Sequence, residues 1–385
     1  MNTKLMPRVI IYVSALLLCA PVLWADWSFV MLGDTRGQRS STTNGVSTHL
    51  RTIAEKIATL NPNLVLVAGD LINGNDTNES AHVSFAQQFV SWKAAMEPVF
   101  DYNTGTGIPI YPVRGNHENN DSEGPVIPEL KQAYYDAFHN YVPFNGPNNG
   151  LGDDQRGFSY SFTTNNATFV VADQYFYDSG SGYHEMDRSW ITQQFQQANS
   201  AYEVFMAHVP IFMTEGQGEP EHFFGHNAAG NHTRSNFWNA LGTNGVQLYV
   251  TGHIHNETVA STTNDYGNTI IQLLAGNGGA PADPVVVDPD PGVSVLYTNG
   301  LYGFSLATVS ADFMKIEYYS LHTGDNSWTK DSYFTLIPAN QVVPEPSTAV
   351  LLGPALVMLV AGRLRRRPVN AAGRTCGRFP DRSSI

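Results

Sequence analysis

Residues 64–70 read Leu-Val-Leu-Val-Ala-Gly-Asp, an unbroken apolar run that ends in a glycine and a carboxylate. Such a run without alternation is typical of a strand that is buried on both faces of a sheet. The preceding residues, from Leu50 to Leu60, carry apolar side chains at helical spacing, and Asn61-Pro62-Asn63 ends that helix. This stretch therefore predicts a helix and a buried strand, with a polar residue at the end of the strand.

The same alternation continues along the chain. Further strands are predicted at 28–32, 108–113, 203–207 and 246–250, helices around 85–96, 186–195 and 235–241, and a hairpin at Asn165-Asn166 between 158–162 and 168–172. After Asn268 the pattern becomes mainly strands, at 269–274, 304–309, 314–319 and 333–337. Residues 281–291 are predicted to form a loop, and residues 214–232, too long for a simple connector, a lid. The alternation predicts an α/β sandwich of two sheets with helices outside.

Residues 1–25 have a basic start, an apolar run and a small residue before Asp26, which predicts a secretory signal. A buried N-terminal strand is the alternative. The two cysteines, Cys19 and Cys376, both lie outside the predicted mature domain, residues 26–340. Neither disulfides nor thiolate chemistry are therefore expected in that domain.

The C-terminal region has the features of a second targeting signal. Val343-Pro344-Glu345-Pro346-Ser347 precedes fifteen uncharged residues and the basic cluster at 363–367. Residues 341–367 resemble the PEP-CTERM sorting signal of Gram-negative bacteria. The resemblance implies transient membrane anchoring, processing by an exosortase-like sorting protease, and a place at the cell surface, in the periplasm or outside the cell. The tail, residues 368–385, departs from that pattern and has no predicted role.

The formal charge of −13 is distorted by the two ends of the chain. Nine of the 21 basic and two of the 34 acidic residues lie before Asp26 or after Val343, which leaves 12 basic against 32 acidic residues, a net of −20. A surface this acidic repels polyanions, so no nucleic-acid partner is expected. A small phosphorylated substrate still fits if a metal supplies positive charge locally.

Five short polar segments stand at the ends of predicted strands. They are Gly33-Asp34-Thr35-Arg36, Gly69-Asp70, Gly115-Asn116-His117-Glu118, His208 and Gly252-His253-Ile254-His255. Ligands of α/β sheets gather at the carboxyl ends of strands, and a glycine lets the backbone approach a ligand closely. Each segment alone is more often a turn or a hydrogen-bonded core histidine. Together, carboxylates, an amide oxygen and imidazoles predict a site for Mn, Fe or Zn.

This ordered set resembles the calcineurin-like metallophosphoesterase superfamily, which includes purple acid phosphatases and Ser/Thr protein phosphatases. The resemblance covers roughly residues 27–337 and implies a four-layer α/β/β/α sandwich, with two mixed sheets flanked by helices and two metal ions in the site. It implies that Asp70 bridges the metals and that His117, which binds neither, acts as general acid. The remaining ligands would be Asp34 and His255 for the first metal, and Asn116, His208 and His253 for the second.

The first metal's ligands depart from the family pattern. Many members have Asp-X-His where this chain has Arg36, which cannot bind a cation. Purple acid phosphatases supply a Tyr three residues after the bridging Asp, where this chain has Asn73. We therefore expect a weaker first metal, with Asn73 as a ligand through its amide oxygen or a water. Arg36 and Arg114 are interpreted as phosphate contacts, and a surface salt bridge is the alternative for Arg114.

The sequence thus predicts an exported, metal-dependent phosphoesterase that hydrolyses phosphate esters through a metal-bridged hydroxide. Monoesters are slightly favoured over diesters, by analogy with acid phosphatases alone. The alternative is a cell-surface or matrix protein that retains the fold and binds without cleaving. His117 favours the enzyme, because a binding protein has no evident need for an acid that holds no metal.

Overall fold

The computed structural model describes residues 26–37, 44–74, 83–119, 127–148, 154–176, 186–198, 200–212, 231–285 and 287–336. The predicted signal, sorting segment and tail lie outside these residues, as does the predicted lid except for its last two positions. These four assignments therefore stay predictions. Within the described ranges, no helix is both long enough and apolar enough to cross a membrane.

The first sheet has six strands in the order β15-β14-β13-β1-β2-β5. They are β1 (Trp27–Leu32), β2 (Leu64–Val67), β5 (Ile110–Pro112), β13 (Tyr302–Val309), β14 (Met314–His322) and β15 (Ser327–Leu336). β1, β2 and β5 run parallel, whereas β13, β14 and β15 join antiparallel. The three parallel strands therefore end at one edge, where Asp34, Asp70 and Asn116 follow them.

The second sheet has seven strands in the order β12-β10-β11-β9-β8-β7-β6. They are β6 (Tyr160–Thr164), β7 (Ala167–Val171), β8 (Tyr202–Met206), β9 (Val246–Thr251), β10 (Glu257–Thr263), β11 (Thr269–Ala275) and β12 (Val293–Asn299). β7, β8, β9 and β11 run parallel, and the other three antiparallel. β8 and β9 lead into the histidine segments. A separate short hairpin joins β3 (Phe100–Asp101) to β4 (Thr106–Gly107).

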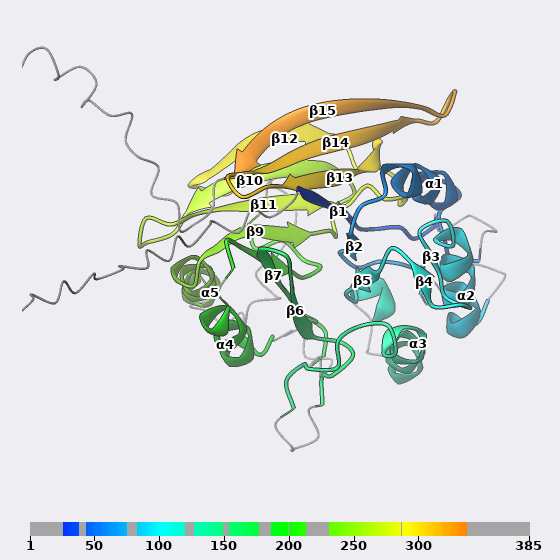
Figure 1. Cartoon of the computed structure of the whole chain (residues 1–385), viewed down its shortest axis with the longest axis horizontal. Helices are drawn as coiled ribbons and strands as arrows, with labels where there is room; N and C mark the ends of the chain where they lie inside the picture. The colour runs from blue at the N-terminus through cyan, green and yellow to red at the C-terminus, as the bar shows by residue number, and fades with distance from the viewer. Residues whose placement is uncertain are drawn as a thin grey trace, which may run out of the picture. The chain divides into compact units, whose positions relative to one another are not determined.

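Helices cover the outer face of each sheet (Figure 1). α1 (Leu50–Leu60), α2 (Phe85–Ala95) and α3 (Pro128–Phe138) pack on the first sheet, and α4 (Arg188–Gln197) and α5 (Asn231–Thr243) on the second. α1 ends at Asn61, which adopts a left-handed conformation and donates back to the last turn, as the Asn-Pro-Asn stop predicts. The predicted four-layer α/β/β/α sandwich with two mixed sheets is confirmed.

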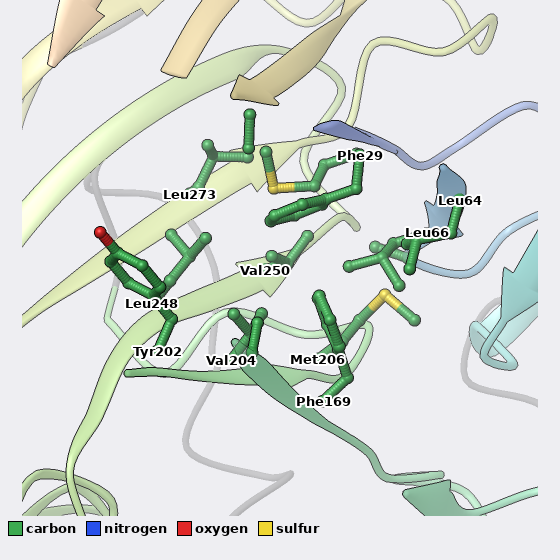
Figure 2. Close-up of a cluster of buried hydrophobic side chains, with 14 of the residues drawn as sticks. Phe29, Leu64, Leu66, Phe169, Tyr202, Val204, Met206, Leu248, Val250 and Leu273 are labelled. Atoms are coloured by element: carbon green, nitrogen blue, oxygen red, sulfur yellow. The ribbon is translucent and has the colours of Figure 1, made fainter. Parts of the chain in front are cut away.

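The alternation of side chains along β1 and β2 explains the layers. Phe29, Leu64 and Leu66 belong to the apolar cluster between the two sheets. Figure 2 shows these side chains packed against residues of β7, β8 and β9. Val30 and Val65 point the other way, into the cluster beneath α1, α2 and α3. Both faces of β2 are therefore buried, which accounts for its unbroken apolar sequence. Burial of each large apolar side chain stabilises the fold by about 1.5–3 kcal/mol.

The elements not anticipated from the sequence are α3, β10 and β12, together with the short strands β3 and β4 and the one-turn 3-10 helix Asn116–Glu118. In α3 the buried residues Leu130, Tyr134 and Phe138 recur every fourth position, and the helix begins at Pro128, so the sequence carries a helix signal that the prediction missed. β12 is an edge strand with mostly half-exposed side chains, so main-chain pairing with β10 holds it rather than an apolar face. β15 likewise begins six residues before the predicted strand, because its polar first half pairs with β14 through the backbone.

One buried carboxyl in β8 makes the stability of the fold depend on pH. Glu203 is 6% exposed, and its Oε2 has no hydrogen-bond partner among the described residues. Burial raises the pKa of Glu203 from 4.5 to about 8. Because the folded chain holds this proton more tightly than the unfolded chain does, stability is lost as the pH rises through that range.

We predict that Glu203→Gln raises the free energy of unfolding at pH 8 by at least about 1.4 kcal/mol, the equivalent of one pKa unit. Below about pH 4 both chains carry a neutral group at this position, so the difference should vanish. Urea denaturation at both pH values measures it. A gain of equal size at both values would contradict the assignment.

Candidate metal centre

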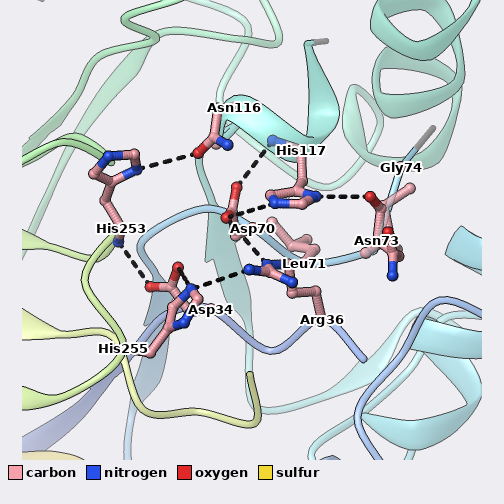
Figure 3. A network of polar contacts seen from close by, with 12 residues as sticks. Asp34, Arg36, Asp70, Leu71, Asn73, Gly74, Asn116, His117, His253 and His255 are labelled. Carbon is pink, nitrogen blue, oxygen red and sulfur yellow. Dashed lines mark hydrogen bonds and ion pairs between the residues drawn. The ribbon is translucent and has the colours of Figure 1, made fainter. Parts of the chain in front are cut away.

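Figure 3 shows side chains from four of the five polar segments meeting in one place. His208, the fifth, contacts Asn116 and His253 there. Hydrogen bonds join the sheets at this point. His208 Nδ1, after β8, donates to Ala68 O after β2 at 2.7 Å, and His253 N, after β9, donates to Asp34 Oδ2 at 2.9 Å. Side chains that are far apart in the sequence are thereby held within contact distance.

Four ligand atoms converge on one point, and we call their residues the second ligand set: Asp70, Asn116, His208 and His253. His208 Nε2 lies 3.0 Å from Asn116 Oδ1, 3.3 Å from His253 Nδ1 and 3.4 Å from Asp70 Oδ1. Metal–ligand bonds of about 2.0–2.2 Å place neighbouring ligands about 2.8–3.6 Å apart. Because Nδ1 of His208 is the donor to Ala68, Nε2 presents its lone pair. The spacing around His208 Nε2 is therefore that of neighbouring metal ligands.

The predicted first ligand set, Asp34, Asp70 and His255, has a different arrangement. Asp34 Oδ1 lies 3.6 Å from His255 Nε2 and is buried, with no hydrogen-bond partner in the described part of the chain. However, Arg36 enters the same space, with Nη2 3.2 Å from His255 Nε2 and Nε 3.5 Å from Asp70 Oδ2. Figure 3 shows the guanidinium between Asp70 and His255. The first set does not fit a second ion while Arg36 stands there.

Asp34 also reaches toward the second ligand set. Its carboxylate, that of Asp70 and the imidazole of His208 offer ligand atoms within 4.8 Å of one another. A single ion in this part of the site therefore has two carboxylates within reach.

Burial sets the protonation of the ligands. It lowers the pKa of His253 to about 3, an effect to which His208 adds, and that of His255 to about 4, with help from Arg36. Both imidazoles are therefore neutral at pH 7, which is the form that binds a metal. Burial and then the charge of Asp70 raise the pKa of Asp34 well above its ordinary value. A carboxylate there requires a nearby cation.

The backbone at the site is strained to bring these atoms together. Asp34, Asp70 and His253 have φ values of 53°, 52° and 77°, in the left-handed region that side chains other than glycine rarely adopt. The glycines are needed for close approach. A Cβ on Gly115 would collide with Asp70 Oδ1, and one on Gly252 with Asp34 Oδ2. The glycines therefore make room for neighbouring carboxylates.

His117 lies beside Asp70, outside both ligand sets. Its Nδ1 donates to the backbone oxygen of Asn73 at 2.7 Å, and its Nε2 lies 3.8 Å from Asp70 Oδ2. Asn73 contacts the site through that carbonyl. Its side-chain amide is buried without a hydrogen-bond partner among the described residues. No contact of the Asn73 amide with the ligand sets therefore supports the ligand role predicted for it.

Arg114 is fully buried in an ion pair with Asp173, with Nε and Nη2 both 2.7 Å from Asp173 Oδ2. Its guanidinium lies over the ring of Phe158, 5.0 Å from the centroid. The surface salt bridge considered from the sequence is therefore wrong, because the pair is internal. The same pairing leaves the predicted phosphate contact of Arg114 without support.

Two supporting residues were missed from the sequence. Glu118 accepts hydrogen bonds from the backbone N–H groups of Asp70, Ile72 and Gly115, at 3.0, 2.9 and 2.8 Å, and so ties the loops after β2 and β5 together. Asp283 accepts from His255 N at 2.9 Å and lies 3.5 Å from its Nδ1. Glu118 directly follows His117, and this position in the sequence could have indicated a role at the site. Asp283 lies in the predicted 281–291 loop, and nothing in the sequence there indicates a role at the site.

The fold and site define a metalloprotein of the two-sheet α/β sandwich class. The family model described as calcineurin-like phosphoesterase matches residues 28–257, more than half of the chain. The chain therefore belongs to the calcineurin-like phosphoesterase family. The enzyme class predicted from the sequence, a metal-dependent phosphoesterase, agrees with that membership. No curated protein sequence matches the chain.

Three solved structures have the same fold. The purple acid phosphatase PPD1 from yellow lupin (Lupinus luteus) seeds has 17% identity and a TM-score of 0.56, covering 82% of this chain and 54% of that one. PhoD has 14% identity and a TM-score of 0.55, covering 81% and 70%. GAP50, the anchor in the inner membrane complex of Plasmodium, has 15% identity and a TM-score of 0.50, covering 80% and 89%. The chain thus spans about half the length of the lupin enzyme.

We predict that Glu118→Gln destabilises the protein by about 1–3 kcal/mol, because an amide NH₂ must face one of three backbone donors. Metal affinity should fall as well, because Asp70 loses its fixed backbone. Thermal denaturation and metal titration by calorimetry measure the two effects. Glu97→Gln, on the surface, is the matched control and should change stability by under about 0.5 kcal/mol. Equal effects of the two variants would contradict the role of Glu118.

Proposed function

We propose that this protein hydrolyses phosphate esters at the metal centre formed by the second ligand set. The observation that carries the proposal is the convergence of four ligand atoms beside His117, a histidine that belongs to neither ligand set. A binding protein needs the ligands alone, whereas an enzyme also needs a group that handles the proton of the leaving alcohol.

Different residues bind the metal ion and transfer the proton. Asp70 and its partners hold the ion, and when bound, the metal supplies positive charge for the phosphate oxygens and lowers the pKa of water. The carbonyl of Asn73 fixes the Nδ1–H tautomer of His117, so that Nε2 is directed toward the site. Burial lowers the pKa of His117, and the neighbouring Asp70 carboxylate opposes that shift. In the imidazolium form Nε2 also carries a proton, and this proton passes to the leaving oxygen as the ester bond breaks.

The sequence predicts two ions. A first ion would be held by Asp34, Asp70 and His255, and the guanidinium of Arg36 contacts two of these three residues. Fe, Mn and Zn all suit the ligand types present. The number of ions therefore depends on the position of a single guanidinium.

The substrate is proposed to be a small phosphate ester, with monoesters favoured over diesters, hydrolysed outside the cytoplasm. The acidic composition between residues 26 and 343 supports a small substrate over a nucleic acid. The predicted signal and sorting segment support export, transient anchoring and release by a sorting protease.

Turnover of p-nitrophenyl phosphate and bis-p-nitrophenyl phosphate, with added Mn, Fe or Zn, tests the proposal. We expect metal-dependent hydrolysis, faster for the monoester. Asp70→Asn should abolish hydrolysis, and His117→Ala should lower kcat by about 10²–10⁴-fold. His139→Ala is the matched control, since its ring stacks on Tyr135 in the α3 region and should leave kcat unchanged.

The pattern across these variants separates the enzyme from the alternative. A folded protein that binds metal but cleaves neither ester would instead be a binding protein that retains the fold. Loss of activity in Asp70→Asn with no effect of His117→Ala would leave metal-dependent hydrolysis standing but remove His117 as the acid.

A further inference from the structure

We propose that the guanidinium of Arg36 takes the place of the first metal ion, so that the centre holds one ion, on the second ligand set. This inference rests on the metal-dependent function proposed above. The positive charge of an arginine side chain would then occupy the position where members of this family are expected to hold the first metal ion.

The contacts of Arg36 are those that a first metal would need. Its Nη2 lies 3.2 Å from His255 Nε2, and its Nε lies 3.5 Å from Asp70 Oδ2. The other oxygen of Asp70, Oδ1, faces His208 Nε2 at 3.4 Å. Asp70 therefore still stands between two positive positions, one for a metal ion and one filled by the guanidinium.

His255 is oriented to accept from Arg36. Asp283 Oδ2 accepts from the backbone N–H of His255 at 2.9 Å and lies 3.5 Å from its Nδ1. A carboxylate at Nδ1 favours the tautomer with its proton there, which leaves the lone pair on Nε2. That lone pair would otherwise bind a metal, and here it faces a guanidinium N–H.

Arg36 is held in this position by its own backbone. Its N–H donates to Asp70 O at 3.0 Å, and the residue forms an isolated antiparallel bridge with Val46. Its side chain is only 11% exposed. The guanidinium is thus enclosed in the site and is not a surface group that happens to reach inward.

The charge already present beside the first ligand set also favours one ion. Arg36 supplies a positive charge there, with Nε 3.5 Å from Asp70 Oδ2. The second ion would lie against the guanidinium, and like charges in a buried site repel strongly.

The number of ions per chain tests the inference directly. Protein equilibrated with excess Mn²⁺ and then desalted is analysed by inductively coupled plasma mass spectrometry. We expect one Mn²⁺ per wild-type chain and two in Arg36→His, which restores the Asp-X-His pattern. Arg156→His is the matched control, because Arg156 pairs with Asp154 at the surface, and should bind one ion. Electron paramagnetic resonance should show an isolated Mn²⁺ in wild type and a coupled pair in Arg36→His.

Two Mn²⁺ per wild-type chain with a coupled signal would overturn the inference, even if Arg36→His failed to fold. One ion in a folded Arg36→His would overturn the claim that Arg36 excludes the second. Failure of the proposed function has a different signature. One ion per wild-type chain with no turnover of either ester would leave the inference standing and remove the phosphoesterase, whereas no bound ion would overturn both.

Discussion

The structure depends on two buried carboxylates, Asp34 and Asp70, held side by side at the ends of β1 and β2. Backbone N–H groups and Arg36 contact them, and Asp34 Oδ1 has no hydrogen-bond partner among the described residues. Asp34, Asp70 and the imidazole lone pair of His208 converge within 4.8 Å, in a place closed to water on most sides. Carboxylates brought so close are stable only with positive charge between them. The left-handed backbone at Asp34 and Asp70 shows that the chain accepts strain to maintain this cluster. A cation is therefore part of the design of the fold at this edge.

Much of this could be predicted from the sequence, for reasons that individual residues make clear. Asp70 and His208 were identifiable because each follows a short buried strand, and strand ends of parallel sheets converge. β12 was not, because pairing with β10 at the sheet edge holds it rather than an apolar face. α3 was identifiable from its apolar residues at helical spacing after Pro128, and the prediction missed it. The position of the Arg36 guanidinium could not be predicted from the sequence either, because a long side chain has many rotamers and only the surrounding acceptors select one. Asp283 reaches His255 from a loop 28 residues away, a distance that no local pattern encodes.

The comparisons show why the chemistry has to be argued from the residues. A purple acid phosphatase and GAP50, the anchor in the inner membrane complex of Plasmodium, have this same fold at comparable similarity. The sandwich is thus compatible with catalysis and with attachment. In this chain the site brings together Asp70, Asn116, His208 and His253, with His117 beside Asp70 and Arg36 against Asp70 and His255.

The second ligand set draws on both sheets: Asp70 and Asn116 follow strands of the first, His208 and His253 strands of the second. A bound ion therefore links the two halves of the sandwich, and its binding energy adds to the cohesion of the inter-sheet core. An ion present at 100 times its dissociation constant stabilises the folded chain by about 2.7 kcal/mol. Metal supply then governs lifetime as well as activity, because a chain starved of metal unfolds more often and is exposed to proteases each time it does.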